Sequence, residues 1–412
     1  MKFIFTLDEV VSATRIVPLI AENMGNKEEI SDIVSQLLSG NVPFIEGFIR
    51  CVNMLGKYSV HDISEIISNI PLHGEVVRFI QTHTEDCVIV TGHLMCWCEK
   101  LLKKVGCRSY GSEAECADDR VYRIQSILYK EQIVEQYKAL GETVVFIGGS
   151  NDDAEAMNHA DIGIATGLVC EPAQSLLSVC DYVIYDEHAL CRQLCQLCGE
   201  YQTSKSVVIC CAGIGSRLGL GKTKALVRIN GSSLLSWQLK LFASITDVRI
   251  VIGYQGREII EEALKYRNDV VFCYNHRYFE TKTGASYYLG ARHANPETIQ
   301  WDGDLMVHPE DVQKILATPG EFVCYGDISS EDAVYAIVNE KGEVTAFSRT
   351  DGDFEWTGPA SIEKRHLSYS SQHVYNMLEP YCPIKGIKVR AYDIDTYNDY
   401  VRVLEITKYW EL

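Results

Sequence analysis

A short apolar run that feeds a glycine-rich turn constrains the fold of this chain more than any other feature. Val207–Leu226 has the sequence VVICCAGIGSRLGLGKTKAL, in which four glycines surround Arg217 and Lys224 closes the segment. The β-branched run Val207–Cys210 predicts a buried strand. A strand that leads into such a turn predicts a phosphate cradle, because glycine lets backbone N–H groups approach an anion and Arg or Lys neutralises it.

Two common phosphate-binding loops do not fit this segment. Gly221-Lys222-Thr223 lacks the earlier glycine that a P-loop requires at its fixed spacing. The dinucleotide-binding fingerprint also fails, because no third glycine follows at the right distance and Arg217 occupies the loop. The segment therefore predicts a phosphate-binding turn of a different kind.

Four further segments follow the turn in a fixed order. They are IVIGYQGREI with Gly253 and Tyr254, NHRYFETKTGASYYLGAR with Asn275, Thr283 and Ser286, DGDLMV with Asp302 and Asp304, and YDIDTYNDY with Asp393 and Asp395. Together with A-G-x-G-S-R-L and the later K-x-L, this series resembles the nucleotidyltransferases that activate small phosphates or sugar phosphates with an NTP. The resemblance covers about half of the chain and implies a GT-A-like α/β sheet. One departure is Thr223, which stands where the family usually has proline.

The second half resembles the phosphocholine-type cytidylyltransferases more than the long sugar-phosphate enzymes, since it lacks a left-handed helix repeat pattern. The resemblance implies attack by a substrate phosphate oxygen on the α-phosphorus of an NTP, with CTP favoured. It assigns catalytic roles to Arg217 and Lys224 and Mg²⁺ binding to Asp304 and Asp395, with Asp302 and Asp393 as second choices. The nucleotide-binding positions that it implies are Ala212, Gly213, Gly215, Ser216, Gly253 and Tyr254. Arg and Lys on one glycine-rich turn fit this chemistry because it needs neutralised triphosphate charge and in-line positioning.

The acceptor pocket is expected among the aromatic and acidic residues after Asp304. These are Tyr325, Asp327, Tyr335, Phe347, Trp356 and Tyr375. An aromatic box near carboxylates suits a quaternary ammonium such as phosphocholine, and Trp356 and Ser286 are the expected lining residues. Two alternatives stay open. The aromatic residues can instead be core strand residues, or Arg349, Lys364 and Arg365 can serve an acidic acceptor such as an amino-acid phosphate or a phosphonate.

The first half alternates strands and helices, which predicts an open, mostly parallel α/β sheet with a helical insertion after the first strand. The expected strands are 2–7, 87–91, 143–147, 162–165 and 182–184, and the insertion is 10–80. FIFTLDEVVS, VIVTG, Lys130 before a helix and FIGGSNDDAEAMNHADIGIATG resemble the haloacid-dehalogenase superfamily, closest to its phosphoserine-phosphatase branch. The resemblance implies a Rossmann-like sheet with a helical cap.

Several positions of this first half depart from that family. Thr6 replaces the aspartate nucleophile of the family, and Glu9 replaces a residue that is usually glycine. Gly149 replaces the first aspartate of the metal-binding loop. The retained residues are Asp8, Thr91, Lys130, Asp152 and Asp153, while Arg15 and Cys51 stand where the cap has an acidic residue and an arginine. Threonine is a poor nucleophile without an adjacent base, and Mg²⁺ needs several anionic oxygens, so we expect an inactive pseudophosphatase domain. Such a domain can serve as a scaffold for dimerisation or for fixing the second domain. A regulatory phosphate-ligand site at Thr91 and Lys130 and residual phosphatase activity are the alternatives.

Composition supports two soluble domains. The chain has 412 residues, of which 47% are hydrophobic, and a net charge of −18. This charge argues against a nucleic-acid surface, and no apolar run reaches membrane-spanning length. The start MKFIFTLDEV does not resemble a signal peptide. We therefore expect a cytoplasmic protein with neither a nucleic-acid nor a membrane partner, with domains at 1–199 and 205–412, and with homo-oligomerisation open.

The 16 cysteines predict reduced, buried thiols rather than a disulfide framework. Cys191, Cys195 and Cys198 have the C-x3-C-x2-C spacing of an iron–sulfur cradle, but they fall on an apparent amphipathic helix, so we expect a core or linker helix.

Three functions are compared on this basis. The first is a Mg²⁺-dependent cytidylyltransferase that takes an NTP and a small phosphorylated acceptor, an amino-alcohol phosphate or phosphonate, for cell-surface precursors. The second is an enzyme that combines nucleotidyl transfer with phosphatase action. A nucleotidyltransferase whose acceptor is a sugar 1-phosphate is grouped with it. The third is a non-enzymatic nucleotide-binding regulator. The first is favoured because the second half keeps its expected catalytic residues whereas the first half has lost its own.

Overall fold

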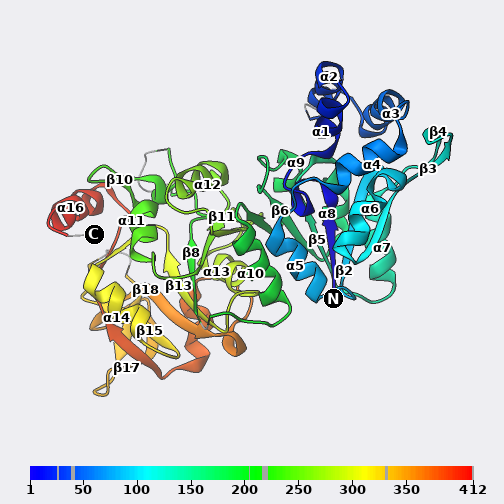
Figure 1. The fold of residues 1–412 in the computed structure, drawn as a ribbon. Coiled ribbons are helices and arrows are strands. Elements are labelled where there is room, and N and C mark those ends of the chain that lie inside the picture. The colour runs from blue at the N-terminus through cyan, green and yellow to red at the C-terminus, as the bar shows by residue number, and fades with distance from the viewer. Residues whose placement is uncertain (26, 39–41, 204, 216–220, 330–332, 411–412) are drawn as a thin grey trace. The chain divides into compact units, whose positions relative to one another are not determined.

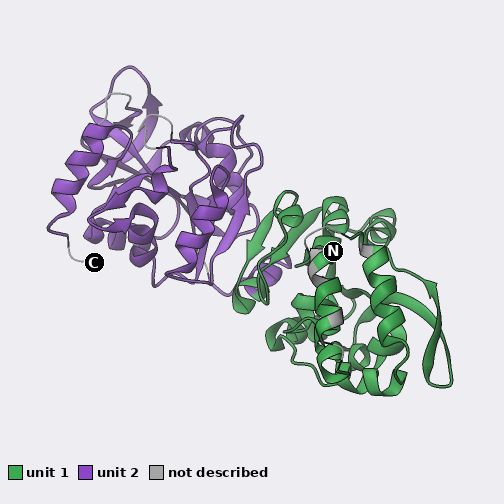
Figure 2. Ribbon diagram, turned by 90° about the horizontal axis from the view of Figure 1, so that it is seen from above, with its two compact units in different colours: residues 1–191 green, residues 192–412 purple. Residues whose placement is uncertain are grey.

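The structure is a computed structural model of the whole chain, and it describes residues 1–25, 27–38, 42–203, 205–215, 221–329 and 333–410. The chain forms two compact units, Met1–Cys191 and Arg192–Leu412, which Figure 2 shows in different colours. The division falls within helix α10 (Glu187–Leu197). The domain limits 1–199 and 205–412 stay a prediction. Both units are mixed α/β, as expected from the sequence.

Unit 1 contains a largely parallel sheet that matches the predicted one. Its order is β7 (Tyr182–Ile184), β6 (Ile162–Thr166), β5 (Val144–Gly148), β1 (Lys2–Thr6), β2 (Cys87–Leu94), β3 (Arg108–Ala117) and β4 (Arg120–Ser126). Neighbouring strands are parallel except β3 and β4, which form an antiparallel hairpin. Strand β1 lies in the middle of this sheet (Figure 1). The hairpin was not predicted, because its mostly polar and exposed side chains form no apolar run.

Helices supply the rest of unit 1. The turn η1 (Leu7–Val11) leads into the predicted helical insertion. This insertion comprises α1 (Ile16–Asn23), α2 (Lys27–Leu38), α3 (Phe44–Leu55), α4 (Val60–Ser68) and α5 (Gly74–Thr82). The later elements are α6 (Met95–Val105), α7 (Lys130–Ala139), η2 (Asn151–Asp153), α8 (Ala154–His159) and α9 (Gln174–Leu177). Helices α6, α7 and α8 pack against the sheet. Residues at the carboxyl ends of β1 and β2 and just after β5 line one cavity together with residues of α1 and α3.

Unit 2 is built around a mixed sheet. Its order is β12 (Val271–Tyr274), β11 (Asp247–Ile252), β8 (Lys205–Cys210), β13 (Glu297–Asp302), β18 (Phe354–Glu363), β16 (Tyr335–Val338), β17 (Glu343–Ser348), β19 (Ile384–Lys388) and β15 (Phe322–Gly326), with β15 also pairing β18. The first four strands are parallel, and β18 runs antiparallel to β13. Two short ribbons pair β9 (Arg228–Ile229) with β10 (Ser232–Ser233) and β14 (Leu305–Val307) with β20 (Ala391–Asp393).

The helices of unit 2 position the loops at the carboxyl edge of the parallel strands. They are α11 (Leu234–Leu241), α12 (Gly256–Leu264), α13 (Thr283–Ala291), α14 (Pro309–Ala317), α15 (Val374–Leu378) and α16 (Tyr397–Thr407), with short turns η4 (Lys224–Leu226), η5 (Lys364–His366) and η6 (Glu379–Tyr381). Helix α13 packs against β8, β11 and β12. No helix in the described part of the chain has both the length and the apolar character needed to span a bilayer.

All 16 cysteines are free thiols. Cys191 and Cys195 lie on α10 and Cys198 follows it, as the helical interpretation predicted. The expectation that the thiols are buried holds only in part, since Cys116 and Cys198 are exposed.

Candidate functional site

The glycine-rich turn of unit 2 follows β8 directly. Gly215 has a φ of 66°, and a Cβ atom there would lie 2.9 Å from Cγ of Lys224, so glycine is required on both grounds. The turn thus brings its backbone against the residue that closes it. Ser216 and Arg217 lie outside the described residues, so their nucleotide-binding and catalytic roles stay predictions.

Lys224 joins the turn to two aspartates that are far away in the sequence. Its Nζ atom donates to Oδ2 of Asp304 at 2.6 Å and also to Oδ1 of Asp395. Asp304 lies in the turn between β13 and β14, and Asp395 lies between β20 and α16. The β14–β20 ribbon holds these two turns side by side, since Leu305 pairs with Asp393. The side chain of Lys224 is 11% exposed, against 27% and 22% for its partners.

Carboxylates outnumber cations among the described residues at this position. Burial lowers the pKa of Lys224, but the charges of Asp304 and Asp395 overcome it and raise the pKa to about 12. Burial and the charge of Asp304 raise the pKa of Asp302 to about 7. Burial and the same neighbours also hold the pKa of Asp393 well above its usual range. Such mutual repulsion favours a further cation at the site.

A cavity of about 380 Å³ opens above this cluster. It is lined by Cys210–Gly215, Thr223–Ala225, Tyr278, Phe279, Thr281–Thr283, Ser286 and Asp302–Asp304. The predicted residues Ala212, Gly213, Gly215, Lys224, Ser286 and Asp304 therefore share one cavity. Tyr278, Phe279 and Lys282 were missed, although they lie within the quoted segment NHRYFETKTGASYYLGAR, because no spacing rule singled them out.

Gly253 and Tyr254 are not among the lining residues of this cavity, and they support its wall instead. The backbone N–H of Tyr254 donates to the carbonyl of Ala212 at 3.1 Å. A Cβ atom at Gly253 would lie 2.7 Å from Cβ of Tyr278, so glycine allows this lining ring to approach. Their nucleotide-binding role stays a prediction.

The expected acceptor residues are spread over two places. Ser286 lines the cavity, and its Oγ accepts from Nδ2 of Asn275 at 3.0 Å. Trp356 lies on β18 outside the lining and packs against Phe347, with ring centroids 5.4 Å apart. Of the three alternative cations, Lys364 donates to the hydroxyl of Tyr201 and Arg365 pairs with Glu363. Arg349 contacts the ring of Tyr375 instead.

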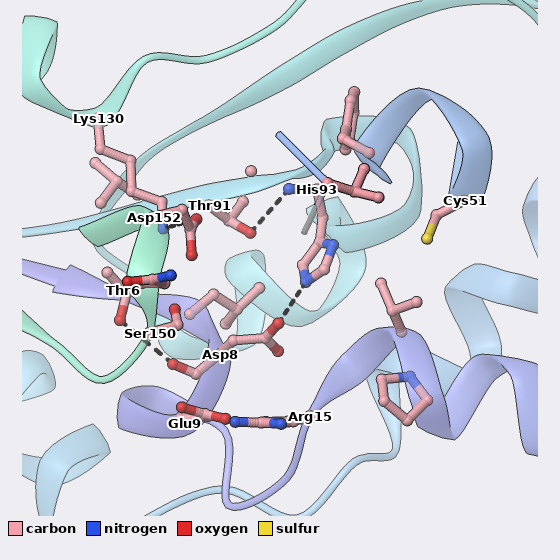
Figure 3. Close-up of a pocket in the computed structure, with 18 of the residues that line it drawn as sticks. Thr6, Asp8, Glu9, Arg15, Cys51, Thr91, His93, Lys130, Ser150 and Asp152 are labelled. Atoms are coloured by element: carbon pink, nitrogen blue, oxygen red, sulfur yellow. Dashed lines mark hydrogen bonds and ion pairs between the residues drawn. The ribbon is translucent and has the colours of Figure 1, made fainter. Parts of the chain in front are cut away.

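Unit 1 holds a second cavity, also of about 380 Å³, at the carboxyl ends of β1 and β2 (Figure 3). Its lining includes Thr6, Asp8, Glu9, Arg15, Cys51, Thr91, His93, Lys130, Ser150 and Asp152. The positions retained from the phosphatase-like motifs are thus brought together. His93 was missed, and its Nε2 donates to Oδ2 of Asp8 at 2.9 Å. The other oxygen of Asp8 accepts from the backbone N–H of Ile16 at 3.0 Å.

Lys130 is fully committed to the two aspartates of the loop after β5. Its Nζ donates to Oδ2 of Asp152 at 2.6 Å and to Oδ1 of Asp153. Although burial opposes the charge, both carboxylates hold the pKa of Lys130 above its usual range. Asp153 is buried beneath the cavity, where it accepts from the backbone N–H groups of Gly149 and Ser150 at 3.0 Å each.

Glu9 fills the space beside Gly149. It has a φ of 65°, in the left-handed region that favours glycine, and its carboxylate is buried and paired with Arg15. A Cβ atom at Gly149 would lie 3.0 Å from Oε2 of Glu9. Burial raises the pKa of Glu9 even though Arg15 opposes that shift. The two departures from the phosphatase family, Glu9 in place of a glycine and Gly149 in place of an aspartate, therefore lie next to each other.

The two units differ in how they could accommodate Mg²⁺. No described group of three or more His, Cys, Asp or Glu side chains is arranged as a complete metal cage. In unit 2, Asp304 and Asp395 converge on one ammonium, and a pair of carboxylates plus substrate phosphates is a usual Mg²⁺ environment, so the residues fit. In unit 1, Thr6 and Gly149 offer no carboxylate, Lys130 holds Asp152 and Asp153, and His93 holds Asp8, so the residues do not fit.

Comparisons with known proteins agree with the division into two halves. Residues 207–350 match the family of the MobA-like NTP transferase domain. The bifunctional protein GlmU of Sulfurimonas denitrificans is 30% identical over 149 residues, covering 33% of this chain and 34% of that protein. The phosphoserine phosphatase of Archaeoglobus fulgidus is 25% identical over 175 residues, covering 39% of this chain and 51% of that protein. The chain thus spans about a third of the length of the first of these curated relatives and about half of the length of the second.

A solved structure is also similar to the chain. The CTP:phosphocholine cytidylyltransferase of Streptococcus pneumoniae is 20% identical, with a TM-score of 0.41, and the similarity covers 50% of this chain and 100% of that one. The chain therefore carries a MobA-like NTP transferase domain in its second half, and its first half resembles phosphoserine phosphatases.

Proposed function

We propose that unit 2 is a Mg²⁺-dependent nucleotidyltransferase that joins the NMP part of an NTP, with CTP favoured, to a small phosphorylated acceptor. The observation that carries this proposal is the convergence of Asp304 and Asp395 on Lys224, which together with Asp304 lines a cavity walled by the glycine-rich turn. An amino-alcohol phosphate or phosphonate is the proposed acceptor class. The proposal places the reaction in the cytoplasm, where NTPs and small phosphate esters are available.

The reaction is a single displacement at phosphorus. An oxygen of the acceptor phosphate forms a bond to the α-phosphorus, the bond from that phosphorus to the β-phosphate oxygen breaks, and pyrophosphate leaves. The chain does not need a covalent intermediate, so its residues act by positioning and by neutralising charge. The turn at Gly213 and Gly215 offers backbone N–H groups to the triphosphate, and Lys224 offers its ammonium where the charges of both substrates meet.

Asp304 and Asp395 would hold Mg²⁺, which would neutralise phosphate charge and align the two substrates when bound. Lys224 and the metal are then alternative or joint counter-ions for the same two carboxylates. Because Lys224 stays cationic far above neutral pH, it remains available for phosphate when a metal takes its place on the aspartates.

The test is pyrophosphate release by the full chain with Mg²⁺, each of the four NTPs and a panel of small phosphates. We expect release with CTP and one small phosphate ester, and its loss when EDTA removes the metal. Release with UTP or dTTP and a sugar phosphate would keep the reaction but overturn the substrate assignment. Tight NTP binding with no release for any pair would instead favour a regulator and overturn the enzymatic proposal.

We also propose that unit 1 does not hydrolyse phosphate esters. Thr6 lacks the carboxylate that would become phosphorylated, and Lys130 lies beside Asp152 (Figure 3). The ammonium of Lys130 is held by both Asp152 and Asp153. Phosphate release from O-phosphoserine and from p-nitrophenyl phosphate, measured with Mg²⁺, tests this. Metal-dependent release that Asp8→Asn abolishes would overturn it and would favour a bifunctional enzyme.

A further inference from the structure

An aromatic cluster lies on the acceptor side of unit 2. Phe347 packs against Trp356 with ring centroids 5.4 Å apart and nearly perpendicular planes, and against Tyr375 at 5.7 Å. These residues come from β17, β18 and α15, which the chain brings together from separate segments. An aromatic cluster of this kind can take a quaternary ammonium only if a ring face is open to it.

The ring of Tyr375 already carries a cation. The guanidinium carbon of Arg349 lies 5.6 Å from the ring centroid, and Nε of Arg349 donates to the hydroxyl of Tyr375 at 3.2 Å. The imidazole of His373 also stacks with this ring, at 5.7 Å and 13°. An ammonium ligand would therefore have to displace the guanidinium of Arg349 from this ring. The two cations would repel each other, and the contacts between Arg349 and Tyr375 would be lost.

The strand that carries Trp356 also approaches the aspartates. A Cβ atom at Gly358, two residues further along β18, would lie only 2.6 Å from Oδ2 of Asp302. Gly358 has a φ of 100°, and the pairing of β15 with β18 shifts register between Trp356 and Ala360, so the strand is irregular here. Strand β18 therefore connects the aromatic cluster to the aspartate group.

A second cation connects the same region to the cavity wall. Lys282 lines the cavity, and its backbone N–H donates to the carbonyl of Ser371 at 3.1 Å. The neighbouring contact from the N–H of Gly284 to the carbonyl of Gln372 is 2.8 Å long. These bonds hold the segment before His373 against Lys282. Beyond the effect of burial, the charges of Lys282 and Arg349 both lower the pKa of His373, so the three side chains are electrostatic neighbours.

Neither cation has a carboxylate partner in the part of the chain that the structure describes. Among those residues, Arg349 bonds only to the Tyr375 hydroxyl, and Lys282 forms no ion pair. Asp351, the acid closest in sequence to Arg349, accepts hydrogen bonds from Ser348 and Thr350. Lys282 lines the cavity, and Arg349 lies on the far side of the His373–Tyr375 segment from it. Both side chains are exposed, so they are open to an anionic group of the substrate.

We propose that the acceptor carries a carboxylate in addition to its phosphate, and that Lys282 and Arg349 bind this carboxylate beside the aromatic cluster. The inference rests on the proposed nucleotidyl transfer and narrows its acceptor class from amino-alcohol phosphates to phosphorylated amino or hydroxy acids. The two cations are specificity-determining residues, whereas Lys224 serves the reacting phosphates.

A matched pair of acceptors tests the proposal, because O-phosphoserine is O-phosphoethanolamine with one added carboxylate. Pyrophosphate release is measured for both, and for phosphocholine, with CTP and Mg²⁺. We expect kcat/KM for O-phosphoserine to exceed that for the other two by about tenfold or more, the usual size of one charge-assisted contact. A preference for O-phosphoethanolamine or phosphocholine would overturn the inference but leave the proposed function standing. No release with any acceptor would count against both.

Variants separate carboxylate binding from other roles of the two cations. Arg349→Gln should raise KM for O-phosphoserine about tenfold while changing kcat/KM for O-phosphoethanolamine by less than about twofold. Lys282→Gln should raise KM for O-phosphoserine by more than it raises KM for O-phosphoethanolamine. Arg365→Gln and Lys364→Gln remove an arginine and a lysine that contact Glu363 and Tyr201 instead, and they serve as controls with unchanged kinetics. A rise in KM for CTP in Lys282→Gln, with the acceptor KM unchanged, would show that Lys282 binds the triphosphate and would overturn its assignment.

Discussion

Each unit holds a lysine between two aspartates beside a cavity of about 380 Å³. Lys130 contacts Asp152 and Asp153 in unit 1, and Lys224 contacts Asp304 and Asp395 in unit 2. The difference lies in one of the two aspartates. Asp153 is fully buried and bonded to the backbone, whereas Asp152 in unit 1 and both aspartates of unit 2 are partly exposed. The lysine of unit 1 is therefore tied to one fully enclosed carboxylate, while both carboxylates of unit 2 are open to a ligand.

The surrounding charges sharpen this contrast. In unit 1, Arg15 pairs with Glu9, so the described carboxylates near the loop after β5 each have a cationic or backbone partner. In unit 2, Asp302 and Asp393 add negative charge, and the pKa values of both are raised by burial and by the neighbouring carboxylates. The carboxylates of unit 2 therefore still favour binding of a further cation, whereas those of unit 1 already have partners within the chain.

Removing the accessible lysine should have the largest effect. We expect Lys224→Ala and Asp304→Asn each to reduce pyrophosphate release by about 10³-fold or more, because preorganised charge at the reacting phosphates is lost. Circular dichroism and thermal melting should show that the fold is kept. Lys240→Ala, on the exposed side of α11, is the matched control and should retain full activity. An unchanged rate in either site variant would remove Lys224 or Asp304 from the proposed site.

Removing the buried lysine should affect stability instead. Lys130→Ala leaves Asp153 as an uncompensated buried charge, which costs about 3 kcal/mol of the free energy of unfolding. Lys138→Ala on the same helix breaks an exposed pair with Asp161 and should change that free energy by less than about 0.5 kcal/mol. Urea unfolding, with hydrogen exchange of β5 reporting on unit 1, measures both. Equal costs would mean that Lys130 is not a structural residue of the kind described.

The sequence predicted the fold where apolar runs and turns are local. The strands of unit 1 at 2–6, 87–94, 144–148, 162–166 and 182–184 lie where their β-branched residues placed them. The β3–β4 hairpin was missed because its side chains are mostly polar and exposed, so its formation depends on pairing rather than on burial. The motifs of the second half were recognised by their order along the chain. In the structure, Lys224 and Asp304 from these motifs line one cavity, and Asp395 accepts a hydrogen bond from Lys224.

Contacts between distant segments could not be predicted in the same way. The pairing of Lys224 with Asp395 spans 171 positions, and the link between Glu9 and Gly149 depends on how β1 and β5 align. No spacing rule singled out His93 or Lys282. Only the folded chain shows that His93 bonds to Asp8 and that Lys282 lines the cavity of unit 2. Single-sequence patterns report periodicity and spacing, and they do not report which side chains share a cavity.

The linked exchange at positions 9 and 149 gives a smaller effect that tests the closed state of unit 1. Gly149→Asp places a carboxylate against Glu9 and above Asp153, which should cost about 2 kcal/mol of the free energy of unfolding. In the Glu9→Gly background the same substitution should cost at least about 1 kcal/mol less. A double-mutant cycle from urea unfolding measures this coupling.

The cycle also bears on whether phosphatase activity can be restored. Thr6→Asp alone should not yield phosphate release from O-phosphoserine, because position 149 still lacks a carboxylate and Lys130 still holds Asp152 and Asp153. Additive costs at positions 9 and 149, or activity from Thr6→Asp alone, would contradict the linked exchange.

The smallest effect concerns the pH dependence of unit 2 without metal. The pKa of Asp302 is raised to about 7, above its ordinary value of 3.8. The folded chain therefore binds a proton that the unfolded chain has already released, and the free energy of unfolding falls as pH rises from about 4 to about 7. Asp302→Asn removes this loss, so in EDTA the free energy of unfolding of the variant should fall less than that of the parent between pH 4 and pH 8. Urea unfolding across that range measures the difference. Parallel curves would show that the carboxylates of unit 2 are not in conflict, and the contrast with unit 1 would then rest on exposure alone.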